Sequence, residues 1–424
     1  MLDRARVRSF RFLTSALAAS ALVAPVLVVL AGTTACSASS SGDSSGDGGT
    51  SADAALPTAV VEAMKSATTG YATLVRASYV DTLAGMNELK TAIHAFVDAP
   101  SKEKLDAARA TWVKVRPAYS QTEVFRFYGG PIDADDTGPE GRINGWPLDE
   151  AFVDYTKDDP NAGIINRPTE FPDITKELVK EENEKGGEKN LSAGWHAIEF
   201  LLWGQDLSAT GPGDRPYTDF VDGGTAKNQK RRRDYLAAAV DLMVDDFTPV
   251  AAAWDPGVVT SYGATFASKP PKEAFADILK GMGSLAGAEL AKERMNNAYE
   301  TKDQEEEHDC FSDTTTHDLL GNAQGIQNVW LGTYTSLAGA KTTTVGLAEV
   351  VKAADPALEA EVTANIAASV AAIQAIPAPF DQAILGDDSA PGRKAIRAAM
   401  DALAKETASI VKVAAKLGVV INLE

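Results

Sequence analysis

The chain has 424 residues, of which 40 are basic and 59 acidic, so its formal net charge is −19. Apolar residues make up 45% and charged residues 23%, which is ordinary for a soluble globular protein with a sizeable core. Nucleic-acid-binding proteins usually present a basic surface, so this composition argues against nucleic acid as a partner.

The N-terminus has the features of an export signal. Four arginines lie within the first eleven residues, an apolar run covers 13–31, and small residues precede Cys36. This pattern predicts that residues 1–35 are a signal peptide. The position of Cys36 resembles a bacterial lipoprotein cleavage site, which predicts a lipid-anchored mature protein. Thr33 stands where such sites usually have leucine, so a plain secretory signal or an uncleaved anchor remains an alternative.

Residues 36–56 form a Ser/Gly/Asp tract that cannot build a core and is typical of a flexible tether. A tether after a lipidated cysteine suits a domain that works above a membrane. We therefore expect an exported, lipid-anchored protein of the bacterial cell envelope that faces the periplasm or the exterior. If Cys36 carries the lipid, only Cys310 remains, and a lone cysteine cannot form an intramolecular disulfide.

From residue 57 onwards the pattern predicts an all-α fold, because alanine is abundant and the β-branched alternation of strands is scarce. The segment Asp98-Ala99-Pro100-Ser101 ends one helix and caps the next. The basic run at 227–233 reads most simply as a solvated helix start. We expect two tandem, related four-helix-bundle-like domains, 57–250 and 251–424, divided near 245–265.

A helix predicted over 102–127 places Trp112, Arg116, Tyr119 and Glu123 on one stripe. A long irregular stretch then runs from 128 to about 190. A connection of this length is usually functional.

The segment GWHAIEFLLWGQD (194–206) is apolar on nearly every side, yet it carries His196 and Glu199 one helical turn apart. Buried ionisable groups require a partner, a hydrogen bond or a metal. Helical bundles build metal sites from such pairs together with carboxylates of facing helices. Glu123 is the first candidate partner, and Asp133 and Asp149 in the irregular stretch are further ones. The simpler alternative is a buried His196–Glu199 pair or an ion pair with Arg116.

A second cluster, EEEHDC (305–310), precedes another predicted helix. It offers Glu307 and His308 as further ligands. Alternatively, the segment is a solvated acidic loop before the helix. Asp313 or Thr314 would then cap that helix, and Asp318 would favour its positive end. Cap and ligand remain open alternatives. Cys310 fits a small packed residue better than a nucleophile.

The motifs of zinc peptidases are incomplete. Both H-E-x-x-H and H-x-x-E-H require a second histidine, and Phe200 occupies that position after H-A-I-E. The chain has four histidines, His94, His196, His308 and His317, and His94 reads as structural or surface. A three-ligand zinc site would have to be completed from distant parts of the chain.

Several segments together resemble the imelysin-like family, which includes the iron-regulated protein A lipoproteins. GWHAIEFLLWGQD resembles the G-x-H-x-x-E signature. RPAYSQTEVFRFYGGPID, INGWPLDEAFVDY, EEEHDCFSD and NAQGIQNVWLGTY are similar to further family blocks, in the same order.

The resemblance implies an all-helical fold of two related bundles, with the signature near their interface. It implies an exported or membrane-anchored bacterial protein associated with iron uptake or regulation, although the family was named for a peptidase. The residues that match the family blocks are Gly194, His196, Glu199, Glu123, Asp149, Glu307 and His308.

The first hypothesis is an envelope lipoprotein that binds a transition metal ion, with iron favoured and zinc as the alternative. His196 and Glu199 would be ligands, Glu123 and Asp149 would complete the site, and Gly194 would allow close helix packing. An iron-uptake system is an expected partner, and the lipid provides contact with the membrane. A metallopeptidase and a purely structural module are the other two hypotheses.

Overall fold

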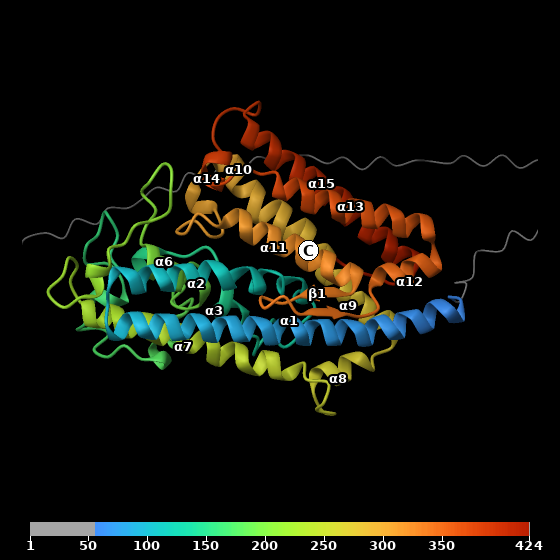
Figure 1. Ribbon diagram of the computed structural model, residues 1–424, viewed down its shortest axis with the longest axis horizontal. Helices are drawn as coiled ribbons and strands as arrows, with labels where there is room; N and C mark the ends of the chain where they lie inside the picture. Colours follow the sequence, from blue (N-terminus) through green and yellow to red (C-terminus); the bar gives the residue numbers. More distant parts are fainter. Residues whose placement is uncertain (1–55, 424) are drawn as a thin grey trace, which may run out of the picture. The chain divides into compact units, whose positions relative to one another are not determined.

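The computed structural model describes residues 56–423, which are almost entirely helical (Figure 1). The prediction of an all-α fold is confirmed. Within these residues the only strands form a small antiparallel hairpin that the sequence did not predict, β1 (Thr333–Thr335) with β2 (Lys341–Thr343). The predicted signal peptide, the tether and Cys36 lie outside the described residues. None of the described helices combines the length and apolarity that crossing a membrane requires.

The longer helices are α1 (Thr58–Asp98), α2 (Lys102–Ser120), α6 (Gly194–Trp203), α7 (Gln229–Ala253), α9 (Pro271–Ser284), α11 (Thr315–Leu331), α13 (Pro356–Gln374) and α15 (Pro391–Lys416). The shorter ones are α3 (Glu140–Asn144), α4 (Glu150–Val153), α5 (Lys176–Glu182), α8 (Tyr262–Ala267), α10 (Asn297–Thr301), α12 (Leu347–Ala354) and α14 (Phe380–Ala383). Single 3₁₀ turns are η1 (Glu123–Phe125), η2 (Ile164–Asn166), η3 (Tyr217–Phe220) and η5 (Gln304–Glu306), and η4 (Leu285–Asn296) is a π-helix.

The N-terminal helices α1, α2, α6 and α7 pack on one another, with α1 between α2 and α7 (Figure 1). As predicted, α1 ends at Asp98 and the Ser101 hydroxyl caps α2 by accepting from the Lys104 N–H. The helix predicted over 102–127 is shorter than expected, since α2 ends at Ser120 and Glu123 lies in the separate turn η1. The stretch from 128 to 190 is less irregular than expected, because it contains α3, α4, η2 and α5.

The C-terminal helices η4, α11, α13 and α15 form a second packed group. It joins the first through contacts of α2 with α11 and of α1 with α9 and α12. The buried apolar side chains of both groups form one continuous core, and the described residues 56–423 lie in one compact unit. The division of this unit into domains 57–250 and 251–424 stays a prediction; residue 250 lies within α7.

The helix from α9 to α10 is continuous and widens into the π-helix η4 in its middle. In a π-helix the repeat brings residues five apart together. Glu289 and Arg294 have this spacing, and the Arg294 Nη2 lies 3.5 Å from the Glu289 Oε2. The widening therefore brings a charged pair to one face of the helix.

The expectation of a solvated helix start at 227–233 is wrong for Arg232. Arg232 is buried, and its guanidinium donates to both carboxylate oxygens of Asp154 at 2.6 and 2.8 Å. Arg215 donates to the same carboxylate. The sequence did not indicate this pairing because Asp154 is 78 residues away in the chain.

Candidate metal centre

Helix α6 supplies the first part of the centre, and all ten of its residues are buried. Its apolar side chains hold it in the core, with the Trp195 ring against Trp112 at 5.9 Å between centroids. Gly194 starts the helix with φ +85°. A Cβ atom at this position would lie 2.5 Å from the Ile143 carbonyl oxygen in α3. Only glycine allows this close approach, which fixes where His196 and Glu199 lie.

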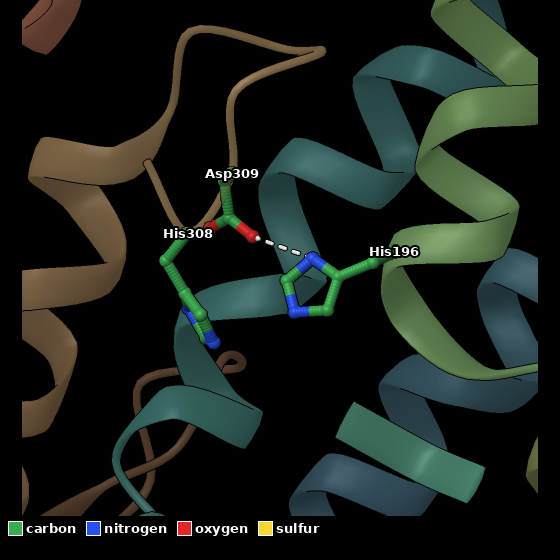
Figure 2. Close-up of side chains that lie close together, drawn as sticks. All are labelled: His196, His308 and Asp309. Atoms are coloured by element: carbon green, nitrogen blue, oxygen red, sulfur yellow. Dashed lines mark ion pairs between the residues drawn. The ribbon is translucent and has the colours of Figure 1, made fainter. Parts of the chain in front are cut away.

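The loop before α11 brings the second cluster to α6. The His308 and His196 rings lie 4.6 Å apart between centroids, and the Asp309 Oδ1 lies 3.5 Å from the His196 Nδ1 (Figure 2). Within residues 56–423, these three side chains are the one set of three or more possible ligands whose donor atoms all lie within 4.8 Å of one another. Two clusters more than 100 residues apart in the sequence therefore meet at one site.

Several polar atoms of this site lack hydrogen-bond partners. The His196 Nε2 and both carboxylate oxygens of Asp309 are buried without one. The Arg116 Nη2 lies 3.4 Å from the Asp309 Oδ1, which is an ion-pair distance without the geometry of a hydrogen bond. A buried group without a partner costs about 1–3 kcal/mol, so orphaned donor atoms that converge are typical of a ligand site.

Burial controls the protonation of the site. It lowers the pKa of His196 well below the usual value, and the neighbouring His308 adds to this effect. Burial also raises the pKa of Asp309 to about 8, although Arg116 opposes the change. The imidazole is therefore neutral and keeps a lone pair for a metal. Asp309 holds a proton near neutral pH, which an incoming cation would displace.

Asp318 in α11 orients His308. Its Oδ2 lies 2.5 Å from the His308 Nδ1. Burial alone would raise the pKa of Asp318, but Arg116 and His308 hold it well below the usual value. The ionised carboxylate therefore accepts the Nδ1–H of His308 and leaves the Nε2 lone pair free. This is the arrangement in which carboxylates support metal-binding histidines.

Glu199 lies beside the three-residue group and holds the loop in place. Its Oε1 accepts hydrogen bonds from the Ser312 N–H at 2.9 Å and from the Ser312 hydroxyl at 2.6 Å. Its Oε2 lies 3.4 Å from the His196 Nδ1. Burial and the neighbouring Asp309 raise the pKa of Glu199 well above the usual value. The i, i+3 spacing thus places Glu199 between helix α6 and the loop that carries His308 and Asp309.

Glu123 occupies a different cluster. Its carboxylate binds the Arg294 guanidinium, with one N–O distance of 3.0 Å, and accepts from the Asn322 amide at 3.0 Å. The Arg126 Nη1 lies 3.1 Å from its Oε2. Burial alone would raise the pKa of Glu123, but Arg294 outweighs it and lowers the pKa to about 2. The structure does not place Glu123 in the three-residue group.

Three other candidates also lie outside the group. Asp149 is exposed and caps α4 by accepting from the Ala151 N–H at 3.0 Å. Asp133 accepts from the Phe127 N–H. Glu307 is buried, and both of its carboxylate oxygens lack a hydrogen-bond partner. Burial and the nearby Asp381 raise the pKa of Glu307 well above the usual value.

Three contributors were not named as ligands or site residues from the sequence. Asp309 belongs to the predicted 305–310 cluster and directly follows His308, but only Glu307 and His308 were named there. Asp318 was considered only as a helix-start residue, and nothing local indicated its bond to His308. Trp146 covers the site, with its ring 4.7 Å from the His196 ring, and its role depends on tertiary packing. Cys310 is buried as expected, and burial raises the pKa of its thiol well above the usual value.

Comparisons with known proteins agree with this architecture. The sequence profile of the imelysin family, which bears the name of a peptidase family, matches residues 75–410. Iron-regulated protein A of Synechococcus elongatus is 26% identical over 331 residues, which are 77% of this chain and 79% of that protein.

Two solved structures share the fold. A candidate iron-regulated protein A precursor from Parabacteroides distasonis has a TM-score of 0.65 at 20% identity, over 86% of this chain and 97% of that chain. An imelysin-like protein from Psychrobacter arcticum has a TM-score of 0.60 at 14% identity, over 85% of this chain and 96% of that chain. Since the family profile spans most of the sequence, the chain belongs to the imelysin family.

Proposed function

We propose that this protein captures a transition metal ion at the cell envelope as part of iron uptake or homeostasis. The observation that carries the proposal is the convergence of His196, His308 and Asp309, whose donor atoms lie within 4.8 Å of one another. The His196 Nε2 and both carboxylate oxygens of Asp309 are buried without a hydrogen-bond partner, which supports the proposal. The relative named iron-regulated protein A supports a link to iron.

The donor set suits a borderline metal. Two imidazole nitrogens and a carboxylate oxygen favour iron or zinc over calcium, which prefers oxygen ligands alone. Iron is the preferred cargo because of the named relative, and zinc is the alternative. His308 would bind through Nε2, since Asp318 engages its Nδ1.

Burial of the centre favours capture over peptide hydrolysis. His196, His308 and Asp309 are 1%, 3% and 0% exposed, which leaves a bound peptide no direct access to them. Glu199 is the carboxylate that would act as the catalytic base of a peptidase, but it accepts two hydrogen bonds from Ser312. A peptidase needs a free base and an open metal position.

Export and anchoring belong to the same proposal. The signal at 1–35 and the lipid on Cys36 would keep the helical unit that carries the candidate metal centre at the envelope. A capture protein at this location would pass its metal to an uptake system in the membrane.

Titration calorimetry with Zn²⁺, and with Fe²⁺ under anaerobic conditions, tests the proposal. We expect micromolar or tighter binding by the parent protein. His196→Ala and Asp309→Asn each remove a ligand, and we expect each to weaken binding about 100-fold or more, roughly 2.7 kcal/mol.

His94→Ala is the matched control. His94 also contacts a carboxylate, with its Nε2 2.8 Å from the Asp241 Oδ1, but it lies on α1 in a half-exposed position. Its removal should leave metal affinity unchanged. If the parent and the ligand variants bind equally, or none of them binds, the cluster has a structural role and the capture function is wrong. Metal-dependent peptide cleavage by the parent would support the peptidase alternative.

A further inference from the structure

A cavity of about 430 Å³ borders the candidate metal centre. His308 and Trp146 form part of its wall, and the Trp146 ring lies 4.7 Å from the His196 ring. The other walls come from α3 and the segment after it, from the loop that follows α5, and from the π-helix η4. The cavity is therefore walled by parts of both helix groups and reaches His308 of the candidate centre.

The lining of this cavity is strongly acidic. It contains two arginines, Arg126 and Arg294, and six glutamates, Glu140, Glu184, Glu188, Glu289, Glu293 and Glu306. The net formal charge of these side chains is −4. A low-dielectric cavity lined by charges of one sign concentrates counter-ions and accelerates their arrival.

The two arginines are already engaged by inner carboxylates. Arg126 Nη1 lies 3.1 Å from the Glu123 Oε2 and 3.0 Å from the Glu140 Oε1. Arg294 binds Glu123 and lies 3.5 Å from Glu289. The positive charge of the lining is thus neutralised deep in the wall and is not free to attract an anion.

The outer carboxylates have no such partner. Glu184, Glu188 and Glu293, named here the rim glutamates, are exposed and form no ion pair within the described part of the chain. Glu293 accepts one hydrogen bond, from the Asn297 amide at 3.1 Å. The uncompensated negative charge of the cavity therefore lies at its solvent side, and the buried His308 forms part of its wall.

We propose that this cavity is the entry route for a positively charged, hydrated metal ion, so that the cargo arrives as a free cation. An anionic chelate of the metal would be repelled by the same carboxylates. This inference rests on the proposed capture function, because it names the form in which that cargo reaches His196 and His308.

Hexaamminecobalt(III) is the first probe. It is a trivalent cation that does not exchange its ammonia ligands, so it binds to carboxylates without coordination to histidine. We expect calorimetry at low ionic strength to show binding by the parent and by His196→Ala. The triple variant E184Q/E188Q/E293Q should bind it about tenfold more weakly, since three uncompensated charges are removed.

The matched control is E62Q/E349Q/E361Q, which removes three exposed carboxylates that do not line the cavity. Its affinity for hexaamminecobalt(III) should stay within about twofold of the parent value, and so should its salt dependence. The second readout is the Zn²⁺ association rate by stopped flow. The rim variant should bind Zn²⁺ more slowly than the parent, and its association rate should depend less on salt. Its Zn²⁺ dissociation rate should match that of the parent.

Each outcome separates the entry route from the capture site. If the rim variant and its control behave alike in both readouts, the entry route is wrong even where Zn²⁺ binding depends on His196. If the parent binds hexaamminecobalt(III) but neither Zn²⁺ nor Fe²⁺, the capture function fails, and the entry role fails with it. Binding of anionic ferric citrate that competes with hexaamminecobalt(III) would also overturn the inference.

Discussion

Two buried charge clusters lie side by side near the start of α11, and they differ in their counter-ions. In the arginine cluster, Arg294 and Arg126 neutralise Glu123. In the histidine cluster, the Asp309 carboxylate has no hydrogen-bond partner, and the Arg116 Nη2 lies 3.4 Å from its Oδ1. Two equally buried carboxylates therefore differ, since guanidinium groups satisfy Glu123 and the Asp309 oxygens accept no hydrogen bond.

The protonation of the two carboxylates shows the same difference. Arg294 outweighs burial at Glu123 and lowers its pKa to about 2, whereas burial prevails at Asp309 and raises its pKa to about 8. A permanent guanidinium turns a buried carboxylate into a structural ion pair.

The largest expected effect comes from breaking the arginine cluster. Glu123→Gln leaves Arg294 and Arg126 buried without their shared counter-ion. Loss of one partner of a buried pair costs about 3–5 kcal/mol. Chemical denaturation should show this loss in the free energy of unfolding.

Glu361→Gln is the control for this change. Glu361 pairs with Lys412 at 2.6 Å on the surface, where it is 42% exposed. Its loss should cost less than about 1 kcal/mol. If Glu123→Gln lowers the free energy of unfolding as little as Glu361→Gln but abolishes metal binding, Glu123 is a metal ligand and its role as a structural counter-ion is wrong.

Glu406 in α15 is a third buried carboxylate, and it shows the effect of burial without an arginine or histidine beside it. Burial raises the pKa of Glu406 in α15 to about 7 from the ordinary 4.5, although Ser369 opposes the change. The folded protein holds this proton up to about pH 7, whereas the unfolded chain releases it near pH 4.5. The stability contribution is therefore complete below pH 4.5 and is lost as the pH rises towards 7.

Glu406→Gln should remove this pH dependence. At pH 8 the variant should be more stable than the parent by up to about 3 kcal/mol, and at pH 4 the two should be similar. Urea denaturation at both pH values measures the difference. Equal differences at the two values would mean that Glu406 titrates normally in the folded protein.

The smallest expected effect concerns Asp149, which lies outside both clusters. Asp149→Ala removes the cap of α4, which costs about 0.5–1 kcal/mol and should leave metal affinity unchanged. Asp355→Ala, at the cap of α13, is a comparable change far from the site in sequence. A tenfold loss of metal affinity with Asp149→Ala alone would restore Asp149 as a ligand.

Local patterns in the sequence were sufficient for the helical fold and for part of the centre. The stop at Asp98 and the cap at Ser101 are short-range features, and the structure has both. His196 and Glu199 were evident because ionisable groups in an apolar helix conflict with their surroundings. Gly194 was evident from the signature, and its positive φ gives the physical reason.

Which buried carboxylates have a counter-ion depends on long-range contacts that the sequence pattern does not show. The sequence predicted Glu123 on one helical stripe with Arg116, but Glu123 lies in the separate turn η1 and its partner Arg294 is 171 residues away. The sequence predicted Arg232 as part of a solvated helix start, whereas in the structure its guanidinium donates to Asp154. Asp309 became a ligand candidate because Glu199 fixes its loop and Asp318 orients His308. Residue spacing determines which side chains share a face, whereas long-range contacts determine which charges are neutralised.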